Sequence, residues 1–192
     1  MRRILINSVL YTIVTTVLLG IGYPLLVTGI ARVAFPKQAN GSLVLDSDGK
    51  TIASTLLAQN FTADKYFNPR PSAAGTGYDS TSSGGSNLGA TSQTLHDNVK
   101  QRVADYRKAN HLGDTQLVPA DAVTASASGL DPHISVKNAL LQLPRVAQAR
   151  GMSEPDVKAL MEKYTDGPDF GILGDAGVNI VKLNLALDGK YK

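Results

Sequence analysis

The hydrophobic pattern of the chain begins with a long apolar stretch close to the N-terminus. Residues 4–31 contain no charged side chain, and about 20 consecutive apolar residues are enough to cross a bilayer as a helix. A cleaved signal peptide is the alternative, because Arg2 and Arg3 precede the stretch and Gly29-Ile30-Ala31 resembles a cleavage site. The apolar region of a signal peptide, however, is typically only about 7–15 residues long. We therefore predict a single transmembrane helix, spanning about residues 4–31, within an anchor of residues 1–35.

Small and hydroxyl-bearing residues recur at every fourth position of this anchor. They are Ser8, Thr12, Thr16, Gly20, Pro24 and Thr28. A step of four residues rotates an α-helix by only about 40° beyond a full turn, so these residues share one slowly coiling face. Because small residues let membrane helices approach closely, we predict that this face packs against other membrane helices. The alternative is that such residues are simply tolerated in lipid.

The pattern after the anchor is that of an α+β domain, which we place at residues 36–192. Residues 42–55 alternate between apolar and polar positions on both sides of the turn-forming residues 46–49, which predicts a β-hairpin. Residues 56–61 are expected to form a strand or a short helix. Residues 178–188 alternate most regularly, and we predict that they form a strand of a small antiparallel sheet.

Capping residues and apolar spacing predict three helices in this domain. Thr91 or Ser92 would cap the first, which carries apolar residues at four-residue spacing and ends near residue 113. Ser135 would cap the second, which Pro144 is expected to interrupt or kink. Ser153, with an acidic residue three positions later, would cap the third. Residues 66–90 are rich in glycine and form a long loop, and loops of that length are often functional.

The charge distribution excludes nucleic acid as a partner. Three of the 19 basic residues, Arg2, Arg3 and Arg32, flank the apolar stretch, and the rest of the chain carries 16 basic and 16 acidic residues. A neutral body lacks the basic surface that polyanion binding requires. Basic residues on the two sides of the anchor are nearly balanced, so the positive-inside rule favours a cytoplasmic N-terminus and an extracytoplasmic domain only slightly.

The composition also argues against a metal site. The chain has no cysteine, and its three histidines lie far apart in the sequence. A zinc site needs at least three suitable ligands, and none of the usual short spacings occurs. The long loop contains Arg70 and Asp79, and we expect these two to pair and fix the loop rather than to hold a cation.

The most conspicuous candidate site is Ser83-Gly84-Gly85-Ser86. Backbone N–H groups of a glycine-rich turn can cradle a phosphate, and a helix that begins near Thr91 would direct its positive end to the same place. A Walker loop, however, needs a lysine on the phosphates, and none occurs between Lys65 and Lys100. We favour a structural turn and keep a nucleotide-binding loop as the alternative.

A second candidate is a hydrolase site in which Ser126 or Ser128 acts with His133. In such a site the base must lie within hydrogen-bond reach of the nucleophile and be oriented by an acid. Residues this close in sequence rarely meet in that way, and the chain has no nucleophile elbow. We therefore prefer turn-capping roles for these residues, with a membrane-tethered hydrolase as the alternative function.

Four long segments together resemble one protein family. They are residues 22–44 (GYPLLVTGIARVAFPKQANGSLV), 66–89 (YFNPRPSAAGTGYDSTSSGGSNLG), 118–135 (VPADAVTASASGLDPHIS) and 164–188 (YTDGPDFGILGDAGVNIVKLNLALD). In this order, and across essentially the whole chain, they look like the C subunit of the bacterial potassium-transporting P-type ATPase, the KdpC family. Pro144 is a local departure, because a more helix-favouring residue is expected there.

The resemblance implies a single-pass subunit of the inner membrane whose C-terminal domain is extracytoplasmic. Its partners would be a channel-like potassium-translocating subunit, a P-type ATP-hydrolysing subunit and a small one-helix subunit. It would stabilise their assembly and support ATP-coupled potassium uptake, and the family is often described as a catalytic chaperone that raises the ATP affinity of the hydrolysing subunit. The chain has neither an Asp-Lys-Thr-Gly-Thr phosphorylation motif nor a Walker site. We therefore expect no catalytic site and no cofactor of its own, with ATP and potassium handled by the partner subunits.

Overall fold

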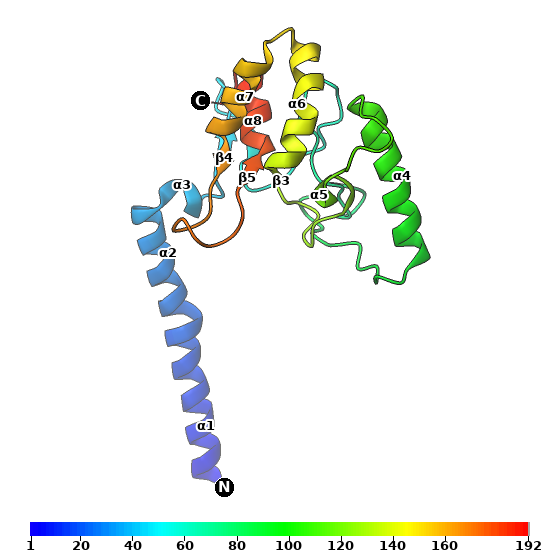
Figure 1. Cartoon of the computed structure of the whole chain (residues 1–192). Helices are drawn as coiled ribbons and strands as arrows, with labels where there is room; N and C mark the ends of the chain where they lie inside the picture. Colours follow the sequence, from blue (N-terminus) through cyan, green and yellow to red (C-terminus); the bar gives the residue numbers. More distant parts are fainter. Residues whose placement is uncertain (192) are drawn as a thin grey trace. The chain divides into compact units, whose positions relative to one another are not determined.

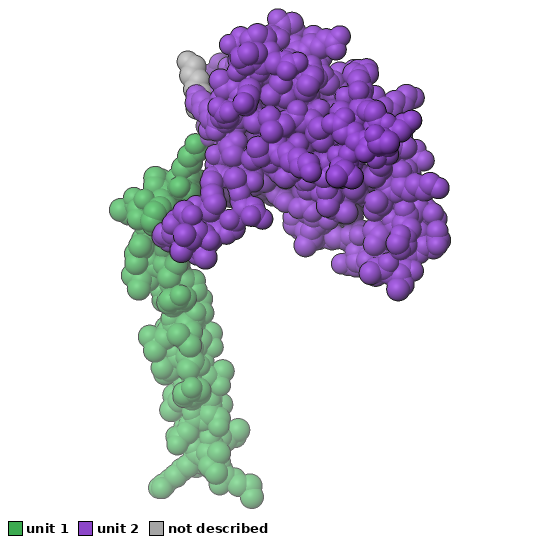
Figure 2. Space-filling view, viewed as in Figure 1, with its two compact units in different colours: residues 1–43 green, residues 44–192 purple. Residues whose placement is uncertain are grey.

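The computed structural model describes residues 1–191 and divides the chain into a first unit, Met1–Leu43, and a second unit that begins at Val44 (Figures 1 and 2). The first unit is dominated by one apolar helix, Arg2–Ala34, of 33 residues with no buried side chain. Its length and composition suit a membrane span, which agrees with the single N-terminal helix predicted from the sequence. A short helix, α3 (Pro36–Ala39), follows it.

The apolar helix changes its hydrogen bonding in the middle. It consists of α1 (Arg2–Thr15), the π-helical segment η1 (Thr16–Gly22) and α2 (Tyr23–Ala34). Pro24 lies two residues after the end of the π-helical segment, and proline lacks an N–H group and crowds the carbonyl four residues earlier. Local π-helical adjustment is one way in which membrane helices satisfy the freed backbone groups. The N–H of Tyr23 accordingly donates to the carbonyl of Leu18, five residues back.

The second unit begins with the predicted hairpin. Strands β1 (Leu43–Leu45) and β2 (Thr51–Ser54) form a two-stranded antiparallel sheet. Asp46 closes the turn, because its Oδ1 accepts the backbone N–H groups of Asp48 and Lys50 at 3.0 and 2.8 Å. The hairpin prediction is therefore confirmed.

Residues 56–61, by contrast, form turns and irregular chain, so the expected strand or helix is wrong there. Their backbone groups have other partners: the N–H of Ala58 donates to the carbonyl of Leu130 at 2.9 Å. A contact with such a distant loop cannot be seen in the local pattern.

A three-stranded antiparallel sheet lies at the centre of the second unit. Its order is β3 (His133–Ser135), β5 (Gly177–Asn179), β4 (Thr165–Asp166). Val178 in the middle strand lies opposite Ile134 on one side and Thr165 on the other. The sheet therefore joins three segments that are far apart in the sequence.

The three predicted helices are present. They are α4 (Gln93–Ala109), α6 (Val136–Arg150) and α7 (Glu154–Lys163), and a short helix, α5 (Ala120–Val123), lies between the first two. Ser92, Ser135 and Ser153 cap them as expected, because each serine side chain accepts a backbone N–H group of the first turn. Helix α6 continues through Pro144 and is not interrupted there.

The predicted strand at residues 178–188 is largely wrong. Only its first two residues belong to β5, and Ile180–Leu187 form the helix α8. The side chain of Asn179 starts this helix by accepting the N–H of Lys182 at 3.1 Å. Helix α8 buries five of its eight residues, so apolar residues occur on nearly every side and imitate the alternation of a strand.

The core lies where α6, α7 and α8 cover the small sheet (Figure 1). Phe67, from the long loop, is fully buried in it. Asn184 of α8 holds this residue by two backbone hydrogen bonds, accepting from the N–H of Phe67 and donating to its carbonyl, each at 2.9 Å. The start of the long loop is therefore part of the core.

Arg145 on α6 connects the long loop to two helices. Its side chain is almost fully buried, with 5% exposed. Its guanidinium donates to the side chains of Asn110, Asn68 and Gln142, each at 2.9 Å, and to the carbonyl of Asp64. All these acceptors are neutral, and burial lowers the pKa of Arg145. The guanidinium of Arg145 thus stabilises the fold by donating several hydrogen bonds at once.

Candidate functional site

An open hollow lies between residues 126–132, which include the two serines of the candidate hydrolase site, and the long loop. Its volume is about 710 Å³. Its lining is Leu56, Leu57, Arg70, Ser80, Ser83, Ser126, Ala127, Ser128, Leu130, Asp131 and Pro132. The structure thus brings together residues from two of the sequence-predicted candidates, the glycine-rich turn and the serine segment, which are about 45 residues apart.

The glycine-rich turn is bonded to the serine segment. The carbonyl of Ser128 accepts both the Oγ hydroxyl of Ser83 at 3.0 Å and the N–H of Gly84 at 2.9 Å. Gly129 has φ +66, and a Cβ atom there would lie 2.6 Å from the carbonyl oxygen of Gly84. A glycine is therefore required where the two segments meet.

This contact gives Ser83-Gly84-Gly85-Ser86 a structural role. The N–H of Gly84 points at a protein carbonyl, and a Cβ atom on Gly85 would lie 3.0 Å from the carbonyl of Ala127. The turn therefore uses part of its backbone to hold a neighbouring loop. Nucleotide binding by these four residues stays a prediction.

Arg70 pairs with a residue other than the one predicted. Its NH1 group lies 2.9 Å from Oδ2 of Asp131, and its NH2 group donates to the carbonyl of Ala125 at 3.3 Å. Asp79 instead accepts the N–H and hydroxyl of Thr81, and these two bonds lower its pKa. The predicted Arg70–Asp79 pair is wrong, because a local Asx turn satisfies Asp79.

His133 extends this pair into a row of charges. Its Nε2 atom lies 2.9 Å from Oδ2 of Asp166 on β4, and its Nδ1 atom lies 3.7 Å from Oδ1 of Asp131. Lys182 on α8 contacts Asp166 at 3.2 Å. The row runs Arg70, Asp131, His133, Asp166, Lys182, with basic and acidic groups in alternation. No local sequence pattern marks Asp166 and Lys182 as parts of this site, because only the β3–β5–β4 sheet and the start of α8 bring them to His133.

The pKa values of the row follow from these contacts. Hydrogen bonding to Asp131 raises the pKa of His133, burial opposes this, and Asp166 raises it further. Burial by itself would raise the pKa of Asp131 and of Asp166. Hydrogen bonds from His133, together with those from Arg70 and Lys182 respectively, outweigh burial and lower both. The row therefore favours charged His133 between two carboxylates.

The predicted hydrolase arrangement is not assembled. Within residues 1–191, the hydrogen bonds and ion pairs of the His133 ring go to Asp131, Asp166 and Asn179 and not to a serine. The hydroxyl of Ser128 instead accepts the N–H of Leu130 at 3.1 Å, and Ser126 is buried. A nucleophile within reach of its base is the first requirement of such a site, so this alternative is not favoured.

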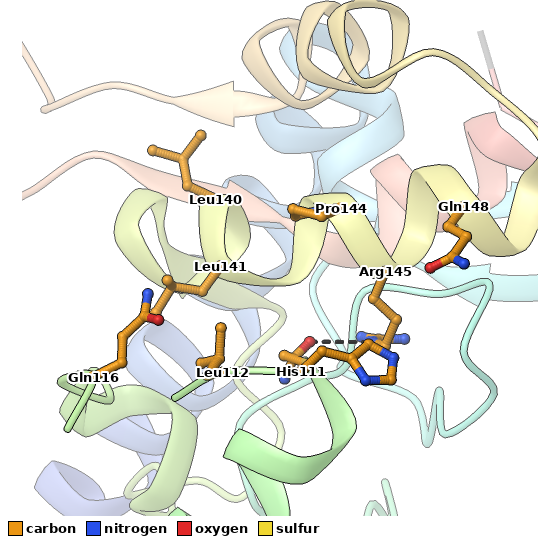
Figure 3. A pocket seen from close by; sticks show the side chains of 9 residues that line it. His111, Leu112, Gln116, Leu140, Leu141, Pro144, Arg145 and Gln148 are labelled. Carbon is orange, nitrogen blue, oxygen red and sulfur yellow. Dashed lines mark hydrogen bonds between the residues drawn. The ribbon is translucent and has the colours of Figure 1, made fainter. Parts of the chain in front are cut away.

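A second hollow lies beside α6, between that helix and the segment that follows α4 (Figure 3). Its volume is about 580 Å³, and its apolar lining is Leu112, Leu140, Leu141 and Pro144. Arg145 also borders it, and the figure shows its side chain reaching from α6 toward the segment after α4. Its Nε group donates to Asn110. Because this guanidinium is already bonded by the fold, we assign it a structural role.

The predicted membrane-packing face is modified by η1. Ser8 and Thr12 turn their hydroxyls back to the carbonyls of Ile4 and Ser8, each at 2.9 Å, so these hydroxyls are satisfied within the helix. Four residues overshoot a full α-helical turn, whereas they fall short of a turn in a π-helix, whose hydrogen bonds span five residues. The segment η1 therefore reverses the drift of the stripe. This keeps its members closer to one side of the helix than an unbroken α-helix would.

Comparisons with known proteins cover nearly the whole chain. A family model described as the c chain of the K⁺-transporting ATPase matches residues 5–189. The potassium-transporting ATPase KdpC subunit of Mycobacterium tuberculosis (strain H37Rv) is 54% identical over 188 residues, which are 98% of this chain and 99% of the relative. The proteins of the same name from Koribacter versatilis and Caulobacter vibrioides are 49% and 52% identical, over 98% and 92% of this chain and 96% and 88% of their own. The similarity thus includes both the apolar helix and the second unit.

Proposed function

Because this chain belongs to the KdpC family, the c chain of K⁺-transporting ATPases, we propose that it is an accessory subunit that stabilises the assembly of such a complex and has no catalytic site of its own. The observation that carries this proposal is the family match over residues 5–189, which spans both units. A subunit of this complex has a role in potassium transport, and its apolar helix fits a membrane location. The absence of phosphorylation and Walker motifs from the sequence supports a non-catalytic role.

The proposed partners are a channel-like potassium-translocating subunit, a P-type ATP-hydrolysing subunit and a small one-helix subunit, in a lipid bilayer. The packing face of Ser8, Thr12, Thr16, Gly20, Pro24 and Thr28 would contact membrane helices of these partners. The reversal of its drift by η1 supports this role, because a straighter face can remain in contact with a straight neighbour over more turns. The neutral second unit is proposed to dock on the channel-like subunit.

The proposed orientation places the N-terminus in the cytoplasm and the second unit outside the inner membrane. The support is the slight excess of positive charge at the N-terminus, where Arg2, Arg3 and the terminal amine lie together. With this orientation ATP stays on the other side of the membrane. Any effect of the chain on the ATP affinity of the hydrolysing subunit would then be transmitted through the assembly and not through a nucleotide held by Ser83–Ser86.

The first test is assembly. The triple variant Thr12→Leu, Thr16→Leu, Gly20→Leu should lower co-purification of the partner subunits, because bulky side chains prevent close approach of helices. Val9→Leu, Ile13→Leu, Val17→Leu is the matched control, since it also introduces three leucines into the membrane helix, at positions outside the stripe. Equal recovery of the complex from both variants would contradict the packing role.

The second test is topology. A reporter enzyme that is active only outside the cytoplasm, fused after Lys192, should be active, and a reporter that is active only in the cytoplasm should be silent. The opposite result would place the second unit beside ATP and reopen direct nucleotide contact.

A further inference from the structure

The loop between β4 and β5 carries three large apolar side chains into solvent. Phe170 is 92% exposed, Ile172 82% and Leu173 58%. Single apolar residues on a surface are common, but large ones gathered at one place mark interaction sites. We call Phe170, Ile172 and Leu173 the apolar tip.

The apolar tip stands on an ordered backbone. Asp169 and Leu173 form an antiparallel bridge, in which each N–H donates to the carbonyl of the other, at 2.8 and 2.9 Å. The N–H of Gly171 donates to the carbonyl of Pro168 at 3.0 Å. The loop is therefore a closed turn with a defined shape, so that a partner would bind it without first having to order it.

Phe170 adopts a backbone conformation that disfavours its own side chain. Its φ is +53, in the left-handed region where glycine is preferred and a bulky residue is an outlier. The ring is almost completely exposed, so contacts within the described chain do not compensate for this strain. Residues kept in strained conformations cluster at sites of function. A glycine would suit the turn better, and the exposed aromatic ring is available to a partner outside the chain.

The charges around the tip indicate the kind of partner. Residues 167–181 contain Asp169 and Asp175 and no lysine, arginine or histidine. Neither aspartate has an ion pair within residues 1–191, whereas Asp166 is already neutralised by Lys182 and His133. Loops that bind anionic lipid carry basic residues, and two free carboxylates beside the tip oppose that. They match a protein pocket with basic residues on its rim.

We propose that the apolar tip inserts into an apolar pocket, rimmed by lysine or arginine, on another subunit of the K⁺-transporting ATPase complex. This inference rests on the proposed function, because it takes the partner from the same assembly. Phe170 would be the central anchor, since buried aromatic residues dominate binding at such contacts. Asp169 and Asp175 would face the basic rim.

The test uses the full chain expressed with its partner subunits and purified in detergent. The variant Phe170→Gly should weaken the association roughly tenfold or more, as expected for loss of a central anchor, while the unfolding midpoint of the chain stays the same or rises. Leu117→Gly is the matched control, because this side chain is 75% exposed elsewhere on the second unit, and it should leave association unchanged. Asp169→Lys with Asp175→Lys should also weaken association.

A photo-reactive amino acid in place of Phe170 identifies what the tip touches. Crosslinking to a partner subunit supports the proposal. Crosslinking to lipid or to a second copy of this chain overturns it, and so does unchanged association of Phe170→Gly. If the unaltered chain itself fails to co-purify with the partner subunits, the proposed function fails as well. If the unaltered chain co-purifies with the partner subunits, the association measured for the tip variants tests the docking proposal alone. Weaker association supports it, and unchanged association contradicts it.

Discussion

Arg70 pairs with Asp131 at 2.9 Å, although the two are 61 residues apart in the sequence. Asp79, which is closer to Arg70 in the sequence, instead accepts hydrogen bonds from Thr81 in a local turn. The pair of Arg70 and Asp131 joins the glycine-rich loop to the segment that leads into β3. From Asp131 the charge row continues through His133 to Asp166 and Lys182. This row of charges thus connects the long loop, the three-stranded sheet and α8.

Replacing His133 should change how stability depends on pH. The pKa of His133 is raised in the fold, so its contribution to stability is complete below its unfolded value of about 6.5 and is lost as the pH rises through the folded pKa. The pKa values of Asp131 and Asp166 are lowered, so their contribution is present above about 4 and is lost at lower pH. The unfolding free energy, followed by circular dichroism from about pH 2 to 9, should therefore decline at both ends.

His133→Gln should remove the decline at the alkaline end and reduce the acidic one, because His133 is one of the donors that lower the pKa of Asp131 and Asp166. In addition, Asp166→Asn should lower the pKa of His133, which NMR titration of the ring measures directly. An unchanged alkaline limb in His133→Gln would show that another group is responsible.

Gly129→Ala should strongly destabilise the second unit. The added Cβ atom would lie 2.6 Å from the carbonyl oxygen of Gly84 and 2.7 Å from the nitrogen of Ala74. Backbone strain and this clash together are expected to cost about 2–4 kcal/mol. Gly151→Ala is the matched control, since its φ of +62 is similar but its Cβ position is open, and it should cost only about 1 kcal/mol. Denaturant unfolding measures both, and equal losses would refute the role of the loop contact.

Arg145→Met should be among the most damaging substitutions on α6. It leaves the acceptors on Asn110, Asn68, Gln142 and Asp64 without their donor in a buried region. Each buried group left unsatisfied costs about 1–3 kcal/mol before relaxation, so a total loss of about 3–5 kcal/mol is expected. Lys137→Met, at an exposed position of the same helix, should change stability by less than about 0.5 kcal/mol. Comparable denaturation curves for the two variants would contradict this account.

Asn179 offers a test of the helix α8. Its Oδ1 caps the helix and its Nδ2 donates to the carbonyl of Thr55 at 2.9 Å. Asn179→Ser keeps a neutral capping acceptor and loses the donor, whereas Asn179→Ala loses both. The alanine variant should therefore lose about 1 kcal/mol more than the serine variant. Amide exchange of Leu183 to Leu187 should accelerate mainly in the alanine variant, and equal exchange in both would indicate that capping is unimportant here.

The sequence by itself determined those features that depend on neighbours along the chain. The apolar length of residues 4–31 is sufficient for a membrane helix, and Ser92, Ser135 and Ser153 mark helix starts because capping uses groups only a few residues apart. The hairpin around Asp46 belongs to the same class, because it is contained within one continuous segment. The family resemblance could also be read from the sequence, because its four segments occur in order along the chain.

Only the tertiary structure decided which distant groups meet. The strand expected at residues 178–188 became α8 because a helix buried on almost every side has no polar face to show its period. Arg70 pairs with Asp131 and not with Asp79 because the long loop is bonded to residues 125–129. His133 reaches Asp166 because the order β3-β5-β4 brings their two strands to either side of β5. The glycines at 84 and 129 also gained their meaning from the contact of two loops. Pairings of this kind depend on how the backbone closes in space, and the local pattern of residues does not record it.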